Sequence, residues 1–288
     1  MIMNAHRITS LKITVLVENR ARRPSLVTEH GLALWIEADD HRILLDTGLG
    51  KALIPNAWTL GIPFSTTQTI VLSHGHLDHT GGLPELLRRG VSVPIFMHPD
   101  AGMTRYSTRK GHPRPIGMPQ EIQTIVSAQA VMCHTPTTVF PGIWATGPIS
   151  RRNDEDNGDR HLFLDEKALQ PDIVTDDQSL VVETSTGSVI ITGCCHSGIL
   201  ATIEAVRQAN GDRPIVGIVG GLHLMNIQSD NYLLRIADCL RALNVPIIAV
   251  GHCTGERAEM FLDEHLPNRV RPIMTGDVMS FGASSQSL

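Results

Sequence analysis

The sequence has no long apolar run, little cysteine and no excess of positive charge. No apolar stretch approaches the roughly 18 residues that a membrane-spanning helix needs, so we expect no membrane association. The formal net charge of -5 provides no broad cationic surface, which disfavours nucleic acid as a partner. The N-terminal segment lacks the long apolar core and cleavage site of a signal peptide. Five cysteines do not form a typical disulfide framework, which favours a reducing compartment, and we expect a cytoplasmic protein.

Apolar runs of strand length recur in the first half of the chain. They cover residues 11–17, 32–38, 41–47, 69–73 and 93–97. Asp39 and Asp40 stand between the second and third runs and predict a hairpin turn, because Asp tolerates tight backbone geometry. The first half is therefore predicted to be rich in strands.

The second half begins with a predicted hairpin at 179–193 and then changes character. Helical and strand patterns alternate at 199–210, 213–221, 231–244, 245–251, about 255–265 and 271–276. The segment of about 98–172 between the halves is rich in Pro, Gly and charge, which predicts a lid or binding loop inserted in a single domain of residues 1–288. The sequence contains no internal repeat, and it carries no signal of oligomeric state.

Residues that can bind metal recur where predicted strands end. They are Asp46, His74, His196, His223 and His252. In open α/β sheets, ligands bind beyond the carboxyl ends of the strands. We therefore expect these side chains to converge on one edge of the fold.

The stretch "SHGHLDHTGG" (73–82) contains three histidines and an aspartate within six positions. Alternation along an extended loop would direct His74 and His76 to one ion, and Asp78 and His79 to a second ion about 3.5–4 Å away, as in two-metal sites. Gly81 and Gly82 suit a tight turn into a helix at 83–89. The alternative is a polar loop whose histidines only form hydrogen bonds.

"HGHLDH", with "LLDTG" upstream and histidines at later strand ends, resembles the metallo-β-lactamase-fold hydrolase superfamily. The resemblance covers nearly the whole chain. It implies an α/β fold, a four-layer αββα sandwich of two mixed β-sheets, with a dinuclear metal site at one edge. "TGCCHSGI" (192–199), "VGGLHL" (219–224) and "GHCTG" (251–255) are similar to the subgroup named for 7,8-dihydropterin-6-yl-methyl-4-(β-D-ribofuranosyl)aminobenzene 5'-phosphate synthase.

The resemblance assigns roles to individual residues. It implies that His74 and His76 bind the first metal, that Asp78, His79 and His252 bind the second, and that Asp46 lies beneath the site and orients ligands. Two divalent ions are implied, with Zn as the first candidate and Mn or Fe as alternatives.

The chain departs from the superfamily pattern at two places. Gly193 and Cys194 stand where most members have Gly-Asp with a bridging aspartate, and "TDDQ" replaces the usual "HTPG". His196 is our expected third ligand of the first metal, with Asp176 or Asp177 as the competitor. Cys194 either bridges the ions as a thiolate, which would favour Zn, or is a small buried thiol in a tight turn. Cys195 and Cys253 are expected to be structural.

The leading hypothesis is a dinuclear metal-dependent hydrolase that uses metal-activated water on a small ester, lactone or phosphate-containing substrate. Asp78 would orient the water, and His223 would bind substrate or act as general acid, unless it is a structural histidine. One alternative is the subgroup's transferase reaction, which joins a dihydropterin methyl diphosphate to an aminobenzene ribofuranosyl phosphate and releases diphosphate. Another is a metal-bearing binding protein without catalysis.

An anionic small-molecule substrate would explain two basic segments. Arg105, Arg109 and Lys110 could grip phosphate or carboxylate from a lid, although a solvated charged loop explains them equally well. Arg151 and Arg152 form a second candidate pair.

Overall fold

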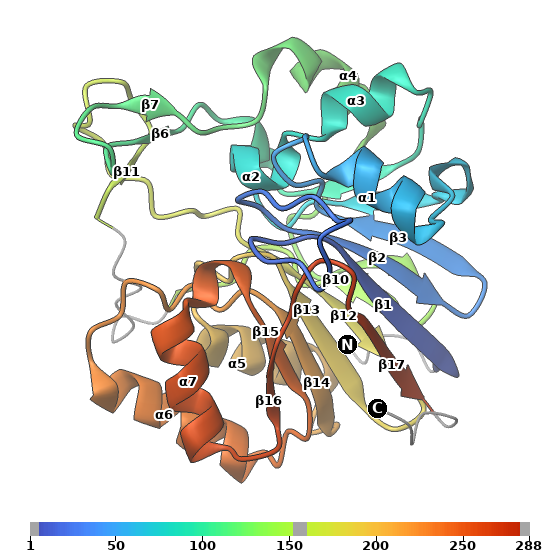
Figure 1. The fold of residues 1–288 in the computed structure, drawn as a ribbon, viewed down its shortest axis with the longest axis vertical. Coiled ribbons are helices and arrows are strands. Elements are labelled where there is room, and N and C mark those ends of the chain that lie inside the picture. Colours follow the sequence, from blue (N-terminus) through green and yellow to red (C-terminus); the bar gives the residue numbers. More distant parts are fainter. Residues whose placement is uncertain (1–5, 152–159, 283–288) are drawn as a thin grey trace.

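The computed structural model describes residues 6–151 and 160–282, and in it two seven-stranded mixed sheets lie face to face (Figure 1). The first sheet has the order β17 (Val278–Gly282), β1 (Ser10–Val17), β2 (Ala33–Ala38), β3 (His41–Leu45), β4 (Thr69–Val71), β5 (Ile95–Met97) and β8 (Ala130–Met132). The second has the order β16 (Val270–Pro272), β15 (Ile248–Val250), β14 (Ile215–Gly220), β13 (Ser188–Thr192), β12 (Ser179–Glu183), β10 (Ile143–Ala145) and β9 (Thr137–Phe140).

Helices cover the outer face of each sheet (Figure 1). On the side of the first sheet lie α1 (Leu53–Leu60), α2 (Leu77–Thr80), α3 (Leu83–Arg88) and α4 (Gln123–Gln129). On the side of the second lie α5 (Ile199–Asn210), α6 (Asp230–Ala242) and α7 (Glu256–His265). No helix in the described parts of the chain is both long and apolar enough to traverse a bilayer.

Three buried apolar layers hold this sandwich together. Along β2, Leu34 and Ile36 belong to the layer between the sheets, whereas Ala33 and Trp35 belong to the layer beneath the helices of the first sheet. This alternation follows from the two-residue period of a strand, and it lets one strand bury both faces. The third layer packs the second sheet against α5, α6 and α7. The expected four-layer αββα architecture is confirmed.

The predicted hairpins and helices are confirmed. Asp39 and Asp40 form the two-residue turn between β2 and β3, where Ala38 pairs with His41. The hairpin predicted at 179–193 is the antiparallel pair β12 and β13. The helices predicted at 199–210, 231–244 and about 255–265 agree with α5, α6 and α7 to within two residues at each end.

The segment 98–172 is divided between the sandwich and a projection from it. It contributes β8 to the first sheet, and β9 and β10 to the second. Its remaining strands form a small third sheet, with the order β11 (Leu162–Phe163), β6 (Tyr106–Ser107) and β7 (Arg114–Pro115). We name β6, β7 and β11, with the loop between β6 and β7, the basic sheet. It extends from one end of the sandwich (Figure 1).

The parallel parts of the two sheets determine where the strand-end residues lie. β3 and β4 are parallel in the first sheet, and β13, β14 and β15 are parallel in the second. Neighbouring parallel strands present their carboxyl ends at the same edge of a sheet. The residues that follow all five strands therefore meet at one edge of the sandwich.

Candidate metal centre

The histidine-rich motif has a different local conformation from the one expected. His76 is extended and caps α2, whose single turn carries Asp78 and His79. The prediction of an extended loop is therefore wrong for the second half of the motif. The side chains still separate into two groups, because the strand-end backbone directs His74 and His76, whereas the helical turn directs Asp78 and His79.

The two glycines after the motif are needed for space rather than for a turn. Gly81 and Gly82 form the expected turn into α3, but their φ values of -65° and -83° are ones that any residue adopts, so the turn itself does not require glycine. A Cβ on Gly82 would lie 2.3 Å from the carbonyl oxygen of Thr47, and one on Gly81 would lie 2.5 Å from that of Leu49. Only glycine lets the backbone that follows β3 approach the motif this closely.

The first cluster consists of His74, His76 and His196. His74 Nε2 and His76 Nδ1 lie 2.9 Å apart, and the His196 ring centroid is 4.8 Å from that of His74 and 5.0 Å from that of His76. Burial lowers the pKa of His74 and His196 well below the ordinary value, and burial with the nearby Arg105 charge lowers the pKa of His76 to about 3. Neutral imidazoles keep the nitrogen lone pairs that a cation requires.

The second cluster consists of Asp78, His79 and His252. Asp78 Oδ2 lies 3.6 Å from His79 Nε2 and 3.5 Å from His252 Nε2. Burial acts to raise the pKa of Asp78, but His79 and His252 outweigh it and hold that pKa well below the ordinary value. Burial opposes protonation of His79, yet Asp78 and Asp46 outweigh burial and raise the His79 pKa to about 9.

Cys194 lies between the two clusters. Its Sγ is 3.1 Å from His79 Nε2. The ligand atoms of Cys194, His74 and His196 all lie within 4.8 Å of one another, and so do those of Cys194, His79 and His252.

Buried hydrogen bonds fix the orientation of these side chains. Asp46 Oδ2 accepts hydrogen bonds from His79 Nδ1 at 2.7 Å and from Ser73 Oγ at 2.6 Å. On the opposite side, Asn19 Oδ1 lies 3.2 Å from His252 Nδ1, while the His252 backbone N–H donates to Glu18 Oε1 at 2.7 Å. His252 Nε2 is buried and has no hydrogen-bond partner among the described residues. A buried imidazole nitrogen in that condition, facing a carboxylate, fits a cation.

The turns that follow the strands use unusual backbone conformations. Asp46, Cys195, His223 and His252 all have left-handed φ, between 50° and 63°. Such values are uncommon for residues other than glycine and gather at functional sites. At this edge they aim several side chains from adjacent turns at one region.

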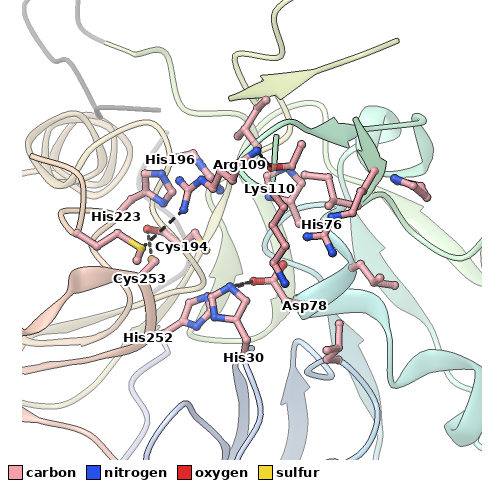
Figure 2. A pocket seen from close by; sticks show the side chains of 18 residues that line it. His30, His76, Asp78, Arg109, Lys110, Cys194, His196, His223, His252 and Cys253 are labelled. Carbon is pink, nitrogen blue, oxygen red and sulfur yellow. Dashed lines mark hydrogen bonds and ion pairs between the residues drawn. The ribbon is translucent and has the colours of Figure 1, made fainter. Parts of the chain in front are cut away.

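A cavity of about 720 Å³ opens onto both clusters (Figure 2). His76, Asp78, Cys194, His196, His223 and His252 line it from the sandwich side. The basic sheet contributes Arg109, Lys110 and Arg114. Apolar side chains complete the wall, namely Leu49, Leu77, Ile116, Leu162 and Met225. The cavity therefore combines candidate metal ligands, three cations and an apolar surface.

Several predicted site residues lie elsewhere. Arg105 was expected to grip a substrate, but its side chain is fully buried, with Nη1 2.9 Å from Asp172 Oδ2 and Nη2 2.7 Å from Asp176 Oδ1. Arg151 donates to the carbonyl oxygens of His196 and Ile173 rather than lining the cavity. Arg152 lies outside the described residues.

Asp176 and Asp177, the alternatives to His196 as metal ligand, accept hydrogen bonds from backbone N–H groups instead. Asp176 Oδ2 accepts a hydrogen bond from the Gly75 backbone N–H at 2.7 Å, inside the histidine motif. Asp177 Oδ2 accepts one from the Ser197 N–H at 2.9 Å, and burial raises the Asp177 pKa to about 6. Neither aspartate lines the cavity, whereas His196 does.

Two titratable residues that line the cavity were missed by the sequence analysis. His30 Nε2 lies 3.3 Å from Asp78 Oδ2, and its ring centroid is 5.0 Å from that of His252. Arg114 lies beyond Arg109 and Lys110 in the same basic stretch of sequence. The charge run signalled Arg114, but no pattern signalled His30, because it precedes a strand rather than following one.

The arrangement of two sheets around this edge agrees with a family assignment. The sequence model of the metallo-beta-lactamase superfamily matches residues 27–252, and the chain belongs to that superfamily.

Individual relatives cover almost the whole chain. The 7,8-dihydropterin-6-methyl-4-(beta-D-ribofuranosyl)-aminobenzene-5'-phosphate synthase of Methanocaldococcus jannaschii is 28% identical over 98% of this chain and 100% of its own. An uncharacterized protein of the same organism is 30% identical over 85% of this chain and 91% of its own. The solved structure of Tm1679, described as a metal-dependent hydrolase of the beta-lactamase superfamily, has a TM-score of 0.80 at 26% identity and covers 95% of this chain and 100% of that one.

Proposed function

We propose that this protein is a metal-dependent hydrolase that binds two divalent cations, one at each cluster, and acts on a small anionic substrate. The observation that carries this proposal is the position of the two clusters, with Cys194 between them, on the floor of the cavity. Bound cations would lower the pKa of water and stabilise negative charge that develops on the substrate.

The protein's own residues would prepare the reaction. Asp78 reaches the cavity, remains ionised because its pKa is low, and would accept a hydrogen bond from the attacking water and orient it. His223 also lines the cavity, with its ring centroid 4.0 Å from that of His196, and would donate a proton to the leaving group. Asp46 fixes His79 and thereby the second cluster.

The residues that line the cavity are suited to an ester, lactone or phosphate-containing substrate that also has an apolar part. Arg109, Lys110 and Arg114 would hold its anionic group. Leu49, Leu77, Ile116 and Leu162 would pack against its apolar part. A cytoplasmic location is part of the proposal, because all five cysteines are free, as expected in a reducing compartment.

A second candidate is the transfer reaction of the synthase relative, because that protein is similar to this chain over its entire length. In this reaction a dihydropterin methyl diphosphate would join an aminobenzene ribofuranosyl phosphate and release diphosphate. The three cavity cations suit a diphosphate as well as a phosphate.

The test is incubation of the zinc-loaded and manganese-loaded protein with phosphodiesters, phosphomonoesters and lactones, beside an assay for diphosphate release from the two synthase substrates. Hydrolysis that disappears in Asp78→Ala is the expected result. Diphosphate release without hydrolysis of any member of the panel would reject the hydrolase in favour of the transferase. Bound metal with no turnover in either assay would reject both.

A further inference from the structure

Cys194 occupies the point that the two clusters share, and the backbone around it is built to hold it there. A Cβ on Gly193 would lie 1.9 Å from Ser73 Oγ and 2.8 Å from Asp46 Oδ2, so the chain passes directly over the floor of the site. Cys195 then takes a left-handed φ of 63°, and its sulfur lies 3.3 Å from Thr202 Oγ1 of α5. The two neighbouring thiols therefore face different surroundings.

The surroundings of Cys194 are polar. Cys133 and Cys195 are buried within the apolar layers on the two faces of the second sheet, where a thiol behaves as a small hydrophobe. Cys194 is equally buried but belongs to none of the three apolar layers, and its sulfur lies near several imidazoles and the thiol of Cys253. Apolar packing therefore does not explain its burial.

The distances around the sulfur suit shared ligation. Zinc is bound at about 2.0–2.1 Å by imidazole nitrogen and about 2.3 Å by thiolate sulfur, so two such ligands stand roughly 3.5–3.6 Å apart at a tetrahedral angle and about 3.1 Å apart at a right angle. Cys194 Sγ lies 3.1 Å from His79 Nε2 and within 4.8 Å of the ligand atoms of His74, His196 and His252. One sulfur can therefore serve a cation in either cluster.

We propose that Cys194 bridges the two cations as a thiolate, a role that rests on the proposed two-cation site and makes it selective for soft metals. The thiol proton passes to solvent as the cations bind. A thiolate favours Zn over Mn or Mg, which oxygen ligands suit better. Among the candidate metals, zinc is therefore the one that this chain retains.

The test is X-ray absorption of protein loaded with two zinc ions, with metal content measured in parallel. A bridging thiolate gives one sulfur neighbour per zinc at about 2.3 Å. A thiolate on one ion gives half that value, and a thiol that binds no metal gives none; either result overturns the proposal. Failure to bind two cations overturns the proposed function as well, whereas two bound zinc ions without sulfur overturn the bridge alone.

Variants provide the controls. In Cys194→Ser the sulfur signal is expected to disappear, and zinc affinity to fall by more than the roughly 10–100-fold that losing an outer hydrogen-bond partner costs. Cys195→Ser and Cys133→Ser are the matched controls, because the first sulfur faces Thr202 and the second donates to the Val131 carbonyl oxygen at 3.6 Å. Cys194→Asp is expected to bind two cations again, with manganese now competing with zinc. A sulfur signal that persists in Cys194→Ser would assign the ligand to the nearby Cys253 thiol, and one that vanishes in Cys133→Ser or Cys195→Ser would assign it to that residue; either result contradicts the proposal.

Discussion

At the scale of single residues, the site depends on side chains held by buried partners rather than on the ligands alone. Asp46 reaches His79, Asn19 reaches His252, and Asp176 reaches the backbone of Gly75. Each contact joins residues distant in sequence. Losing a partner of this kind typically weakens metal binding or activity about 10–100-fold.

Asp78→Ala is expected to abolish binding of the second cation and, with it, turnover. The carboxylate lies 3.5–3.6 Å from His79 Nε2 and His252 Nε2, so its removal leaves that cluster without its carboxylate ligand. Elemental analysis of the purified variant, together with the substrate panel, measures both effects. Wild-type metal content and activity in this variant would contradict the two-cation site.

His30→Ala is expected to lower the affinity for the second cation about tenfold and to leave the affinity for the first unchanged. The His30 imidazole lies 3.3 Å from Asp78 Oδ2, and its loop is pinned because Glu29 accepts hydrogen bonds from the backbone N–H groups of residues 49–52. Zinc titration monitored by calorimetry measures the two affinities. His134→Ala, which removes an exposed histidine outside the cavity, serves as the control. Equal titrations of the two variants would show that His30 has no part in the site.

The strand-end rule identified most of the site from the sequence, but it could not find His30. Asp46, His74, His196, His223 and His252 follow strands whose apolar runs are clear. His30 is positioned by Glu29, which contacts backbone 20–23 residues away, and such a contact leaves no periodic signal. The left-handed φ values at the strand ends were equally inaccessible, since only tertiary contacts impose them on residues other than glycine.

At the scale of elements, long periodic segments were predicted well and short strands were not. The helices α5 and α6 have 12 and 13 residues, enough for a clear apolar face. The strands β8 and β10 have three residues each, fewer than two full alternations, so their membership in the large sheets depends on pairing with distant strands.

The basic sheet is the element expected to determine affinity for an anionic substrate. Arg109→Ala and Lys110→Ala are each expected to raise KM for a phosphate ester roughly 10- to 150-fold, because a hydrogen bond to a charged group is worth about 1.5–3 kcal/mol. KM for a neutral lactone should not change. Arg88→Ala, on the outer face of α3, is the control for loss of a surface cation. An equal rise in KM for both substrate types would contradict a role in holding the anion.

The β2–β3 hairpin provides a test of stability against pH. Asp39 has a left-handed φ of 49° and accepts hydrogen bonds from Thr9 Oγ1 at 2.7 Å and from Ser10 N at 2.9 Å. Burial acts to raise the pKa of Asp39, but these bonds outweigh it and hold the pKa below the ordinary value. The stabilisation is therefore present above the unfolded-state pKa and is lost as pH falls through the lower folded-state pKa.

Asp39→Asn is accordingly expected to lower the free energy of unfolding by about 1 kcal/mol at neutral pH, because Asn tolerates the left-handed backbone but accepts weaker hydrogen bonds. The difference from wild type should shrink below about pH 4. Urea unfolding at several pH values measures it. A difference that stays constant down to about pH 3 would assign the loss to something other than the carboxylate.

At the scale of the whole molecule, the candidate metal centre joins the two sheets. His74, His76, Asp78 and His79 follow β4 of the first sheet, whereas Cys194, His196 and His252 follow β13 and β15 of the second. Cations bound here would link the two sheets at the edge where the apolar layer between them ends.

Removal of metal is therefore expected to lower the stability of the entire fold. Zinc at about 100 times its Kd contributes roughly 2.7 kcal/mol to a protein that binds it only when folded, which corresponds to a fall in Tm of about 5–10 °C on chelation. Calorimetric scans with and without chelator, followed by zinc readdition, measure this effect. In Cys194→Ser the metal-dependent part of the shift should be smaller. An unchanged Tm in the wild type would contradict a site that connects the sheets.

The buried guanidinium of Arg105 couples the basic sheet to the first cluster. β6 begins directly after Arg105, and the Asp172 backbone N–H donates to the carbonyl oxygen of Leu162 in β11 at 2.9 Å. The side chains of Arg105 and Asp172 are paired. Arg105 also pairs with Asp176, whose other oxygen holds the backbone between His74 and His76. β6 and β11 are thus both connected, through Arg105 and Asp176, to the backbone that carries the first cluster. A phosphate bound by Arg109 and Lys110 would displace the basic sheet, and the contacts of Arg105 and Asp176 would transmit this displacement to the backbone of the first cluster. The absorption spectrum of a cobalt ion bound there should therefore change when an anion binds, even when the anion does not contact the ion.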